Sequence, residues 1–104
     1  MTRGEIWLAA LGPVSSEIRK AKPCVVVSPP EMHDYLRTVV VAPMVTGKKP
    51  APYRIPITFE GKRSLILLDQ IRTLDKTRLV KRLGKAAPRV ATSTLSVLRD
   101  VFAE

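Results

Sequence analysis

The sequence predicts a mainly β fold, a compact antiparallel barrel or sheet with one helix packed against it. Three observations lead to this fold class. Short runs rich in Val, Ile and Leu recur between breaks that contain proline or glycine, a hydrophobic pattern of helical period begins only after Pro88, and 104 residues suffice for one core. The sequence contains no internal repeat and no linker-like stretch, so residues 1–104 are expected to form a single domain.

Three strands are expected in the N-terminal half of the chain. They cover residues 5–9, 24–27 and 38–42. Each run is rich in branched or aromatic side chains, and Pro43 is expected to end the third strand. Between the second and third strands, Ser28, Pro29 and Glu31 match a capping box, with serine as the N-cap and proline at the first helical position. This pattern predicts a short helical turn that ends near Tyr35.

Two strand pairs and a helix are expected in the C-terminal half. The pairs cover residues 55–59 with 64–68, turning at Glu60 and Gly61, and residues 70–74 with 77–83, turning at Asp75 and Lys76. Residues 46–52 form a loop by composition, because they include two prolines, one glycine and two lysines. After Pro88, the side chains of Leu95, Leu98 and Phe102 recur at helical spacing. This stripe predicts a helix that contacts the core or a second subunit.

The charge balance points to a polyanionic partner. Eighteen Lys and Arg residues against nine Asp and Glu residues give a formal net charge of +9. Each phosphate that such a chain neutralises releases counterions, so nucleic acid or an acidic protein is the expected partner. The apolar runs are too short to span a membrane, and the first residues lack the apolar core of a signal peptide. We therefore expect a cytoplasmic protein with no membrane partner.

Single cysteine and histidine residues limit the metal chemistry that is available. Cys24 is the only cysteine, which excludes an internal disulfide and a multi-cysteine zinc site, and His33 is the only histidine, which excludes a His-rich metal site. We therefore expect neither a metal nor a cofactor. We also expect Cys24 and Trp7 to lie in the core and His33 to lie on the surface.

A charged segment directly before the second strand is the first candidate site. It contains Glu17, Arg19, Lys20 and Lys22. Cations on a loop bind phosphate, and a carboxylate among them acts as a base or holds a cation in place. The alternative is an ordinary solvated loop, and the spacing of the charges alone favours that alternative.

Asp69 and Gln70 form the second candidate site. Asp69 follows four apolar residues, 65–68, so it is expected at the end of a buried strand. A carboxylate at that place either caps a turn or is a functional group with a raised pKa. The Gln70 amide either reads base edges or satisfies backbone groups, and the pattern alone leaves both alternatives open.

Four segments, in order along nearly the whole chain, resemble the MazF/PemK (Kid) family of type II toxin–antitoxin endoribonucleases. RGEIWL at residues 3–8 is similar to the family's opening RG[DE]IWL, and residues 16–29 are similar to its SEQxxxRPxxVxS segment. Residues 40–46 resemble the VxPxT strand end. LDQIRTLDKTRL at residues 68–79 resembles LDQ[IV]RTxDxxRL, which is the most specific of the four motifs.

The resemblance implies an SH3-like (plasmid-toxin) barrel, a homodimer and an acidic MazE/PemI-like antitoxin as partner. It also implies metal-independent, sequence-specific cleavage of single-stranded RNA, which inhibits translation and growth. In that chemistry the 2′-hydroxyl attacks the adjacent phosphorus and leaves a 2′,3′-cyclic phosphate and a 5′-hydroxyl. Neither a metal nor a histidine is required.

The resemblance also implies which residues form the site. The catalytic residues would be Glu17, Lys22, Thr46 and Asp69, and the RNA-binding residues would be Arg19, Lys20, Lys48, Gln70 and Arg72. Three positions depart from the family pattern. Lys22 replaces the family's arginine, Leu67 replaces a second arginine of the Kid branch, and Thr46 stands one residue later than the family threonine.

Two other functions are compatible with this kind of barrel. A gyrase-poisoning toxin of the CcdB type depends on a tryptophan near its C-terminus, whereas the only tryptophan of this chain is Trp7. A catalytically inactive RNA-binding barrel is suggested by the departures at Lys22 and Leu67. Incubation with a long single-stranded RNA in EDTA separates these alternatives from a metal-independent nuclease.

Overall fold

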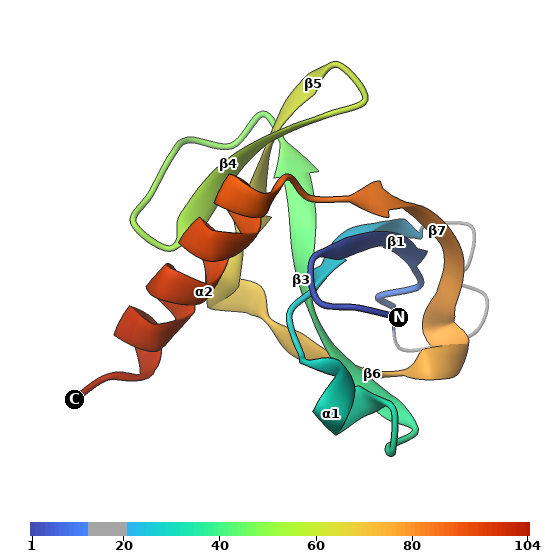
Figure 1. Cartoon of the computed structure of the whole chain (residues 1–104). Coiled ribbons are helices and arrows are strands. Elements are labelled where there is room, and N and C mark those ends of the chain that lie inside the picture. The colour runs from blue at the N-terminus through green and yellow to red at the C-terminus, as the bar shows by residue number, and fades with distance from the viewer. Residues whose placement is uncertain (13–20) are drawn as a thin grey trace.

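The computed structural model describes residues 1–12 and 21–104, which form a strongly curved antiparallel sheet with one long helix against it (Figure 1). The strands are β1 (Glu5–Ala9), β2 (Lys22–Val26), β3 (Thr38–Thr46), β4 (Arg54–Phe59), β5 (Lys62–Leu67), β6 (Arg72–Asp75) and β7 (Leu79–Lys85). The helices are α1 (Pro30–His33) and α2 (Pro88–Phe102), and two 3-10 turns are η2 (Leu68–Gln70) and η3 (Lys76–Arg78). The predicted fold class, mainly β with a C-terminal helix, is confirmed.

β3 is the central strand of the sheet. The strand order is β4-β5-β3-β2-β1-β7, and β6 also pairs with β3. Thr38 to Val41 pair with β6, whereas Met44 to Thr46 pair with β5, so one strand joins the two parts of the sheet. Figure 1 shows that the sheet curls until β7 and β6 approach from opposite ends. Within the described residues no ladder joins β6 to β7, so the shape is that of an open barrel.

The expected pairing of β6 with β7 is wrong, because each strand has another partner. β6 pairs with β3 and β7 pairs with β1. The Asp75 carboxylate accepts a hydrogen bond from the backbone N–H of Thr77 at 2.9 Å, which starts the η3 turn instead of a tight hairpin. The chain therefore leaves β6 in a new direction and crosses to the opposite edge of the sheet.

Pro43 does not end the third strand, contrary to expectation. β3 continues through it to Thr46. Pro43 lies between the four residues that pair with β6 and the three that pair with β5, where this edge of β3 changes its partner. A missing backbone N–H is tolerated at such a position, because neither ladder needs it.

The β4–β5 hairpin follows its local sequence. Phe59 pairs with Lys62, which leaves Glu60 and Gly61 as a two-residue turn. Their φ angles are 51° and 75°, and two positive values identify the type I′ turn that suits the twist of a hairpin. The predicted turn at these two residues is confirmed.

Two apolar clusters form the core. One lies beneath α2 and includes Ile6, Ile66 and Leu68, and helix residue Leu98 packs against it. The other contains Cys24 and its strand neighbours inside the curl of the sheet. Phe102, at the end of α2, is 72% exposed, so the predicted apolar stripe contacts the core only in part.

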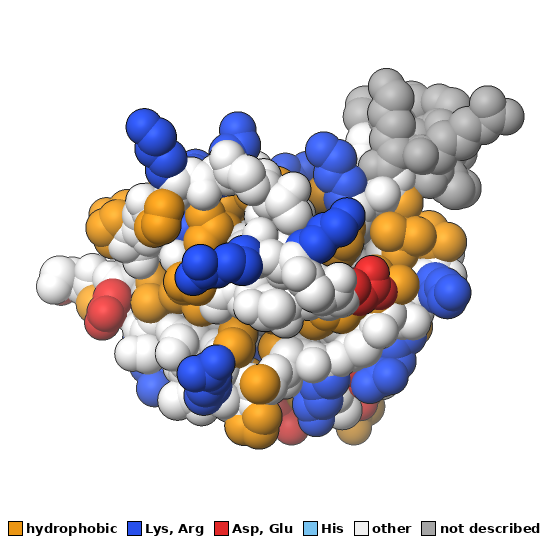
Figure 2. Space-filling model, turned by 90° about the horizontal axis from the view of Figure 1, so that it is seen from above, with side chains coloured by type: hydrophobic (Ala, Val, Ile, Leu, Met, Phe, Trp, Pro, Cys, Tyr) orange, Lys and Arg blue, Asp and Glu red, His pale blue; other side chains and the backbone are white. Residues whose placement is uncertain are grey.

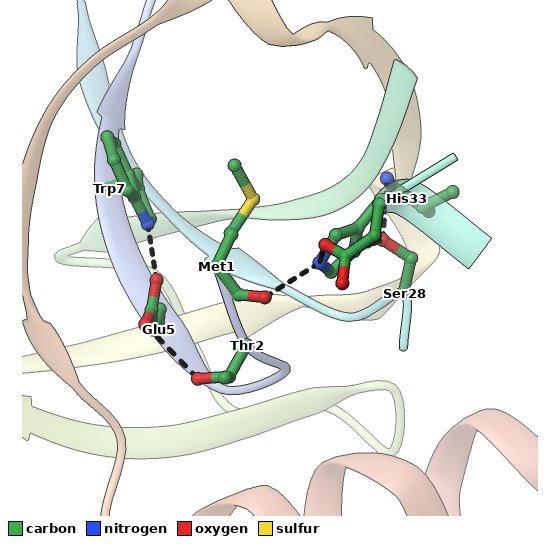
Figure 3. A network of polar contacts seen from close by, with 8 residues as sticks. Met1, Thr2, Glu5, Trp7, Ser28 and His33 are labelled. Atoms are coloured by element: carbon green, nitrogen blue, oxygen red, sulfur yellow. Dashed lines mark hydrogen bonds and ion pairs between the residues drawn. The ribbon is translucent and has the colours of Figure 1, made fainter. Parts of the chain in front are cut away.

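The N-terminus is fixed by a buried polar network around His33 (Figure 3). The backbone N–H of Val40 donates to Ser28 Oγ at 3.1 Å, and the Ser28 hydroxyl faces His33 Nδ1 at 2.9 Å. His33 Nε2 lies 2.9 Å from the Met1 carbonyl oxygen, which can only accept, so Nε2 carries a proton. The predicted surface location of His33 is therefore wrong, as is the Ser28 cap. α1 begins after Pro29 without a side-chain cap, because Ser28 bonds elsewhere.

Candidate nucleic-acid interface

Lys22 lies at the first position of β2, at a place where two cavities adjoin. The larger, which we call the central cavity, has a volume of about 600 Å³. Its polar side chains are Lys22, Thr46, Lys48, Glu60, Lys62 and Ser64. Because β2 runs antiparallel to β3, with Cys24 opposite Pro43, the start of β2 lies beside the end of β3. Strand pairing thus places Lys22 and Thr46 on the wall of one cavity.

The smaller cavity, which we call the entry cavity, has a volume of about 320 Å³ and contains Lys22, Gln70 and Arg72. Lys22 and Val45 line both cavities. The structure therefore brings the predicted residues together as two groups that share Lys22. One group includes Thr46 and Lys48, and the other includes Gln70 and Arg72.

Two arginines hold the chain directly before residues 13–20. Arg78 Nη1 donates to the carbonyl oxygen of Ala10 at 3.1 Å and also to that of Gly12. Arg72 Nη1 lies 3.5 Å from the carbonyl oxygen of Leu11. Leu11 and Gly12, which directly precede residues 13–20, line the entry cavity together with Lys22. Three predicted site residues lie outside the described residues, namely Glu17, Arg19 and Lys20.

Asp69 occupies a different position from the other predicted residues. It lies in η2 and lines neither the central nor the entry cavity. Its carboxylate faces the guanidinium of Arg54, with Nη2 to Oδ2 at 3.4 Å and Nε to Oδ1 at 3.5 Å. Both side chains are partly exposed. The proposed catalytic carboxylate is thus engaged in an ion pair beside the cavities.

Sequence reasoning missed three charged residues of this region, namely Arg54, Glu60 and Lys62. Arg54 stands opposite Leu67 in the β4–β5 ladder, so a guanidinium from the neighbouring strand reaches Asp69 although position 67 is apolar. Glu60 lines the central cavity from the hairpin turn. The turn signal located Glu60 in the chain, but only the register of the strands reveals which cavity the turn borders.

The electrostatic character of the interface is cationic. Lys22, Lys48, Lys62 and Arg72 line the two cavities, against the single carboxylate of Glu60 among the described lining residues. Figure 2 shows blue Lys and Arg side chains projecting at many places on one face of the molecule, with few red carboxylates between them. Ammonium and guanidinium groups bind phosphate oxygens by charge-assisted hydrogen bonds. This arrangement is suited to an anionic backbone.

The described residues contain neither a metal-binding cluster nor a membrane-spanning helix. Across residues 1–12 and 21–104, no group of three His, Cys, Asp or Glu side chains is placed to hold a metal ion. In that part of the chain, neither helix has the length and apolarity that crossing a membrane requires.

Comparisons with known proteins identify the family. A family model described as "PemK-like, MazF-like toxin of type II toxin-antitoxin system" matches residues 2–102. "Endoribonuclease MazF" of Staphylococcus epidermidis is 39% identical over 88 residues, which cover 78% of this chain and 73% of that protein. Its namesake from Staphylococcus saprophyticus is 41% identical over 91 residues, which cover 80% of this chain and 75% of that protein.

Solved structures share the fold. An endoribonuclease from a Mycobacterial species, in complex with its cognate antitoxin, superposes with a TM-score of 0.80 at 22% identity, covering 96% of this chain and 92% of that chain. MazF from Deinococcus radiodurans superposes with a TM-score of 0.77 at 21% identity, covering 97% and 94% of the two chains. The match over residues 2–102 and the two staphylococcal relatives together show that this chain belongs to the PemK-like, MazF-like toxins of type II toxin–antitoxin systems.

Proposed function

We propose that this protein is a metal-independent, sequence-specific endoribonuclease that acts on single-stranded RNA in the cytoplasm. The observation that carries the proposal is the placement of Lys22, Thr46 and Lys48 in one cationic cavity, where β2, β3 and the β4–β5 turn meet. The staphylococcal relatives named as endoribonucleases support the same activity. Single-stranded nucleic acid suits such a site, because its unstacked bases and backbone fit loops and grooves.

The proposed reaction is an in-line transfer within the RNA. The 2′-hydroxyl attacks the adjacent phosphorus, the bond from phosphorus to the 5′-oxygen breaks, and the products carry a 2′,3′-cyclic phosphate and a 5′-hydroxyl. The Lys22 ammonium stabilises charge on the non-bridging oxygens, and the Thr46 hydroxyl donates a hydrogen bond to one of them. A carboxylate takes the 2′-hydroxyl proton, and a proton is delivered to the departing 5′-oxygen.

Among the candidate carboxylates we favour Glu17 as the base. Asp69 is paired with Arg54 and lines neither cavity, so we do not assign it the role of the base. Arg19, Lys20 and Arg72 would hold flanking phosphates. No step of this mechanism requires a metal ion.

We further propose that an acidic antitoxin binds this cationic interface and that the protein forms a homodimer. The Mycobacterial neighbour was solved with its cognate antitoxin, which supports a partner of that kind. The net charge of +9 favours an acidic partner. Val101 and Phe102, which are 37% and 72% exposed at the end of α2, offer apolar surface for a second copy.

Cleavage of a long single-stranded RNA in the presence of EDTA tests the proposal. Wild-type protein should yield fragments with 5′-hydroxyl and 2′,3′-cyclic phosphate ends, because the reaction uses no metal. The matched control for a Lys22→Ala variant is Lys81→Ala, because Lys81 lines neither site cavity. RNA that is bound but not cut would indicate the inactive barrel, and the absence of both binding and cleavage would favour a different toxin class.

A further inference from the structure

A third cavity adjoins the central one and has no role in the proposed reaction. This outer cavity has a volume of about 530 Å³ and lies between the loop after β3, the β4–β5 hairpin and the start of α2. Four cationic side chains line it, namely Lys48, Arg63, Lys85 and Arg89. None of its described lining residues is acidic. Its charge is therefore less compensated than that of the central cavity, which contains Glu60.

The Phe59 ring separates the outer cavity from the central cavity. Phe59, Val45, Lys48 and Ser64 line both, so the two cavities are neighbours that share these side chains. The ring also packs against β7 at a glycine, where a Cβ added to Gly84 would lie 3.4 Å from Phe59 Cε1. Phe59 is partly buried against the core beneath α2. The ring is thus supported from the protein side while it borders both cavities.

An aromatic ring with cationic side chains on both sides resembles the sites at which proteins bind unstacked, single-stranded RNA. Single-strand readers combine a positive groove along the backbone with aromatic side chains on which bases stack. The central and outer cavities each fall in the range of about 300–1,000 Å³ that holds small ligands, so each has room for part of a nucleotide. An RNA strand is continuous, and a strand that is cut in the central cavity must continue somewhere on the surface.

We infer that the outer cavity is a second backbone-binding subsite for the same RNA strand. The strand crosses Phe59, stacks one base on the ring, and places a neighbouring phosphate among Arg63, Lys85 and Arg89. This inference rests on the proposed function, because it assumes that the strand in the central cavity is RNA. It adds that the footprint of the protein extends from the scissile phosphate toward α2.

The salt dependence of RNA binding tests the charge part of the inference. The affinity of the wild-type protein for a fluorescent single-stranded RNA is measured by anisotropy at several salt concentrations. A triple variant, Arg63→Gln, Lys85→Gln and Arg89→Gln, should lower the magnitude of the slope of log K against log salt by about 0.7 for each phosphate that the variant no longer neutralises. The matched control is Arg37→Gln, Lys76→Gln and Lys81→Gln, which removes the same charge outside all three cavities.

Substitutions of Phe59 test the stacking part. Phe59→Leu retains an apolar side chain against Gly84 but removes the ring, so RNA binding should weaken by roughly five-fold or more. Phe59→Tyr keeps the ring and should bind as the wild type does. Thermal melting of each variant establishes that the protein is folded at the temperature of the binding assay.

Each outcome either supports or overturns the inference. The inference is supported if the slope of log K against log salt is smaller in magnitude for the variant at Arg63, Lys85 and Arg89 than for its control, and if Phe59→Leu binds RNA weakly. Equal slopes in the two triple variants overturn it, even where wild-type protein cleaves RNA normally and the proposed function stands. Loss of binding to an acidic antitoxin peptide, with the RNA slope unchanged, also overturns it and assigns the outer cavity to the antitoxin. If wild-type protein neither binds nor cuts RNA, the proposed function itself fails.

Discussion

Lys22 is the residue on which the proposed catalysis depends most, because it borders both site cavities. Lys22→Ala should reduce cleavage by roughly 10²-fold or more, since one preorganised donor to a developing oxyanion is worth about 2.7–4 kcal/mol. RNA binding should weaken much less, because a single phosphate contact is a small part of the affinity. Lys22→Arg should keep or raise activity, because it restores a bidentate fork. Single-turnover cleavage rates measure these effects. Normal cleavage by Lys22→Ala with an inactive Arg19→Ala would transfer the role to Arg19.

His33 is a structural residue, and its replacement should lower stability rather than activity. The imidazole is fully buried and contacts both Ser28 and the Met1 carbonyl. His33→Ala should lower the free energy of unfolding by about 2–4 kcal/mol, because it creates a cavity and leaves buried polar groups without partners. Urea denaturation measures this decrease. His33→Gln is the control, since an amide can serve one of the two partners and should cost less. Equal stability of His33→Ala and wild type would contradict the network in Figure 3.

At the scale of elements, Glu5 links β1 to its neighbour β7. Its carboxylate accepts hydrogen bonds from Trp7 Nε1 at 2.9 Å and Thr2 Oγ1 at 3.1 Å, and faces Arg82 Nε at 3.5 Å. Burial alone would raise the pKa of Glu5, but the hydrogen bonds from Trp7 and Thr2 outweigh it, so the pKa lies below its usual 4.5. A depressed pKa in the folded state means that the ionised Glu5 stabilises the fold above the unfolded pKa. This contribution disappears as the pH falls through the folded value.

Glu5→Gln should therefore destabilise the protein at neutral pH and have a smaller effect in acid. The expected difference from wild type in the free energy of unfolding narrows as the pH falls below the usual pKa of 4.5 and then through the lower folded pKa, because the wild-type carboxylate takes up a proton there. Chemical denaturation at about pH 7 and about pH 3 measures it. The control is Glu31→Gln, because Glu31 is exposed and makes no ion pair among the described residues. A difference that is the same at both pH values would show that the charge of Glu5 is not what stabilises β1.

Local sequence predicted the elements whose signals are local. The β4–β5 hairpin follows from a two-residue turn, and α2 follows from an apolar stripe after Pro88. The sequence did not reveal which strands pair across long distances. β6 pairs with β3 and β7 with β1, although proximity in sequence suggested that they pair with each other. Ser28 illustrates the same limit, because its expected cap is replaced by contacts with Val40 and His33.

The candidate site was predictable to the extent that it lies at strand ends. The family resemblance assigned Lys22 and Thr46 to one site, and they line one cavity because β2 and β3 are antiparallel neighbours. The ion pair of Asp69 with Arg54 depends on the register of β4 against β5. The contribution of Glu60 to the wall of the central cavity depends on where the β4–β5 hairpin lies. Neither relation has a signature in local sequence, because both require knowledge of which side chains face each other across a ladder or cavity.

At the scale of the whole molecule, the exposed end of α2 and the excess of positive charge indicate how the protein assembles. A homodimer should give a mass in light scattering of twice the 11.5 kDa chain mass at micromolar concentration. Phe102→Ser should shift this mass toward that of the monomer, because it removes an aromatic side chain that is 72% exposed. The control is Tyr35→Ser, which changes another exposed aromatic residue that lies outside α2. A wild-type mass equal to one chain would exclude the dimer under those conditions.

The net charge of +9 belongs to the whole molecule and should attract an acidic antitoxin that inhibits the protein. An acidic antitoxin tail that lies in the central cavity should block RNA cleavage, and both ligands should compete for Lys22 and Lys48. We expect such a tail to order as it binds and the opposite charges to speed its association, so its on-rate should fall as salt increases. Stopped-flow association at several salt concentrations, together with cleavage assays at increasing antitoxin concentration, measures both effects. A complex that forms at a salt-independent rate, or that still cleaves RNA, would show that the antitoxin binds away from the cationic cavities. Because the same cations attract RNA and antitoxin, Lys48→Gln should weaken the binding of both ligands. Lys81→Gln, outside the cavities, should weaken the binding of either ligand far less.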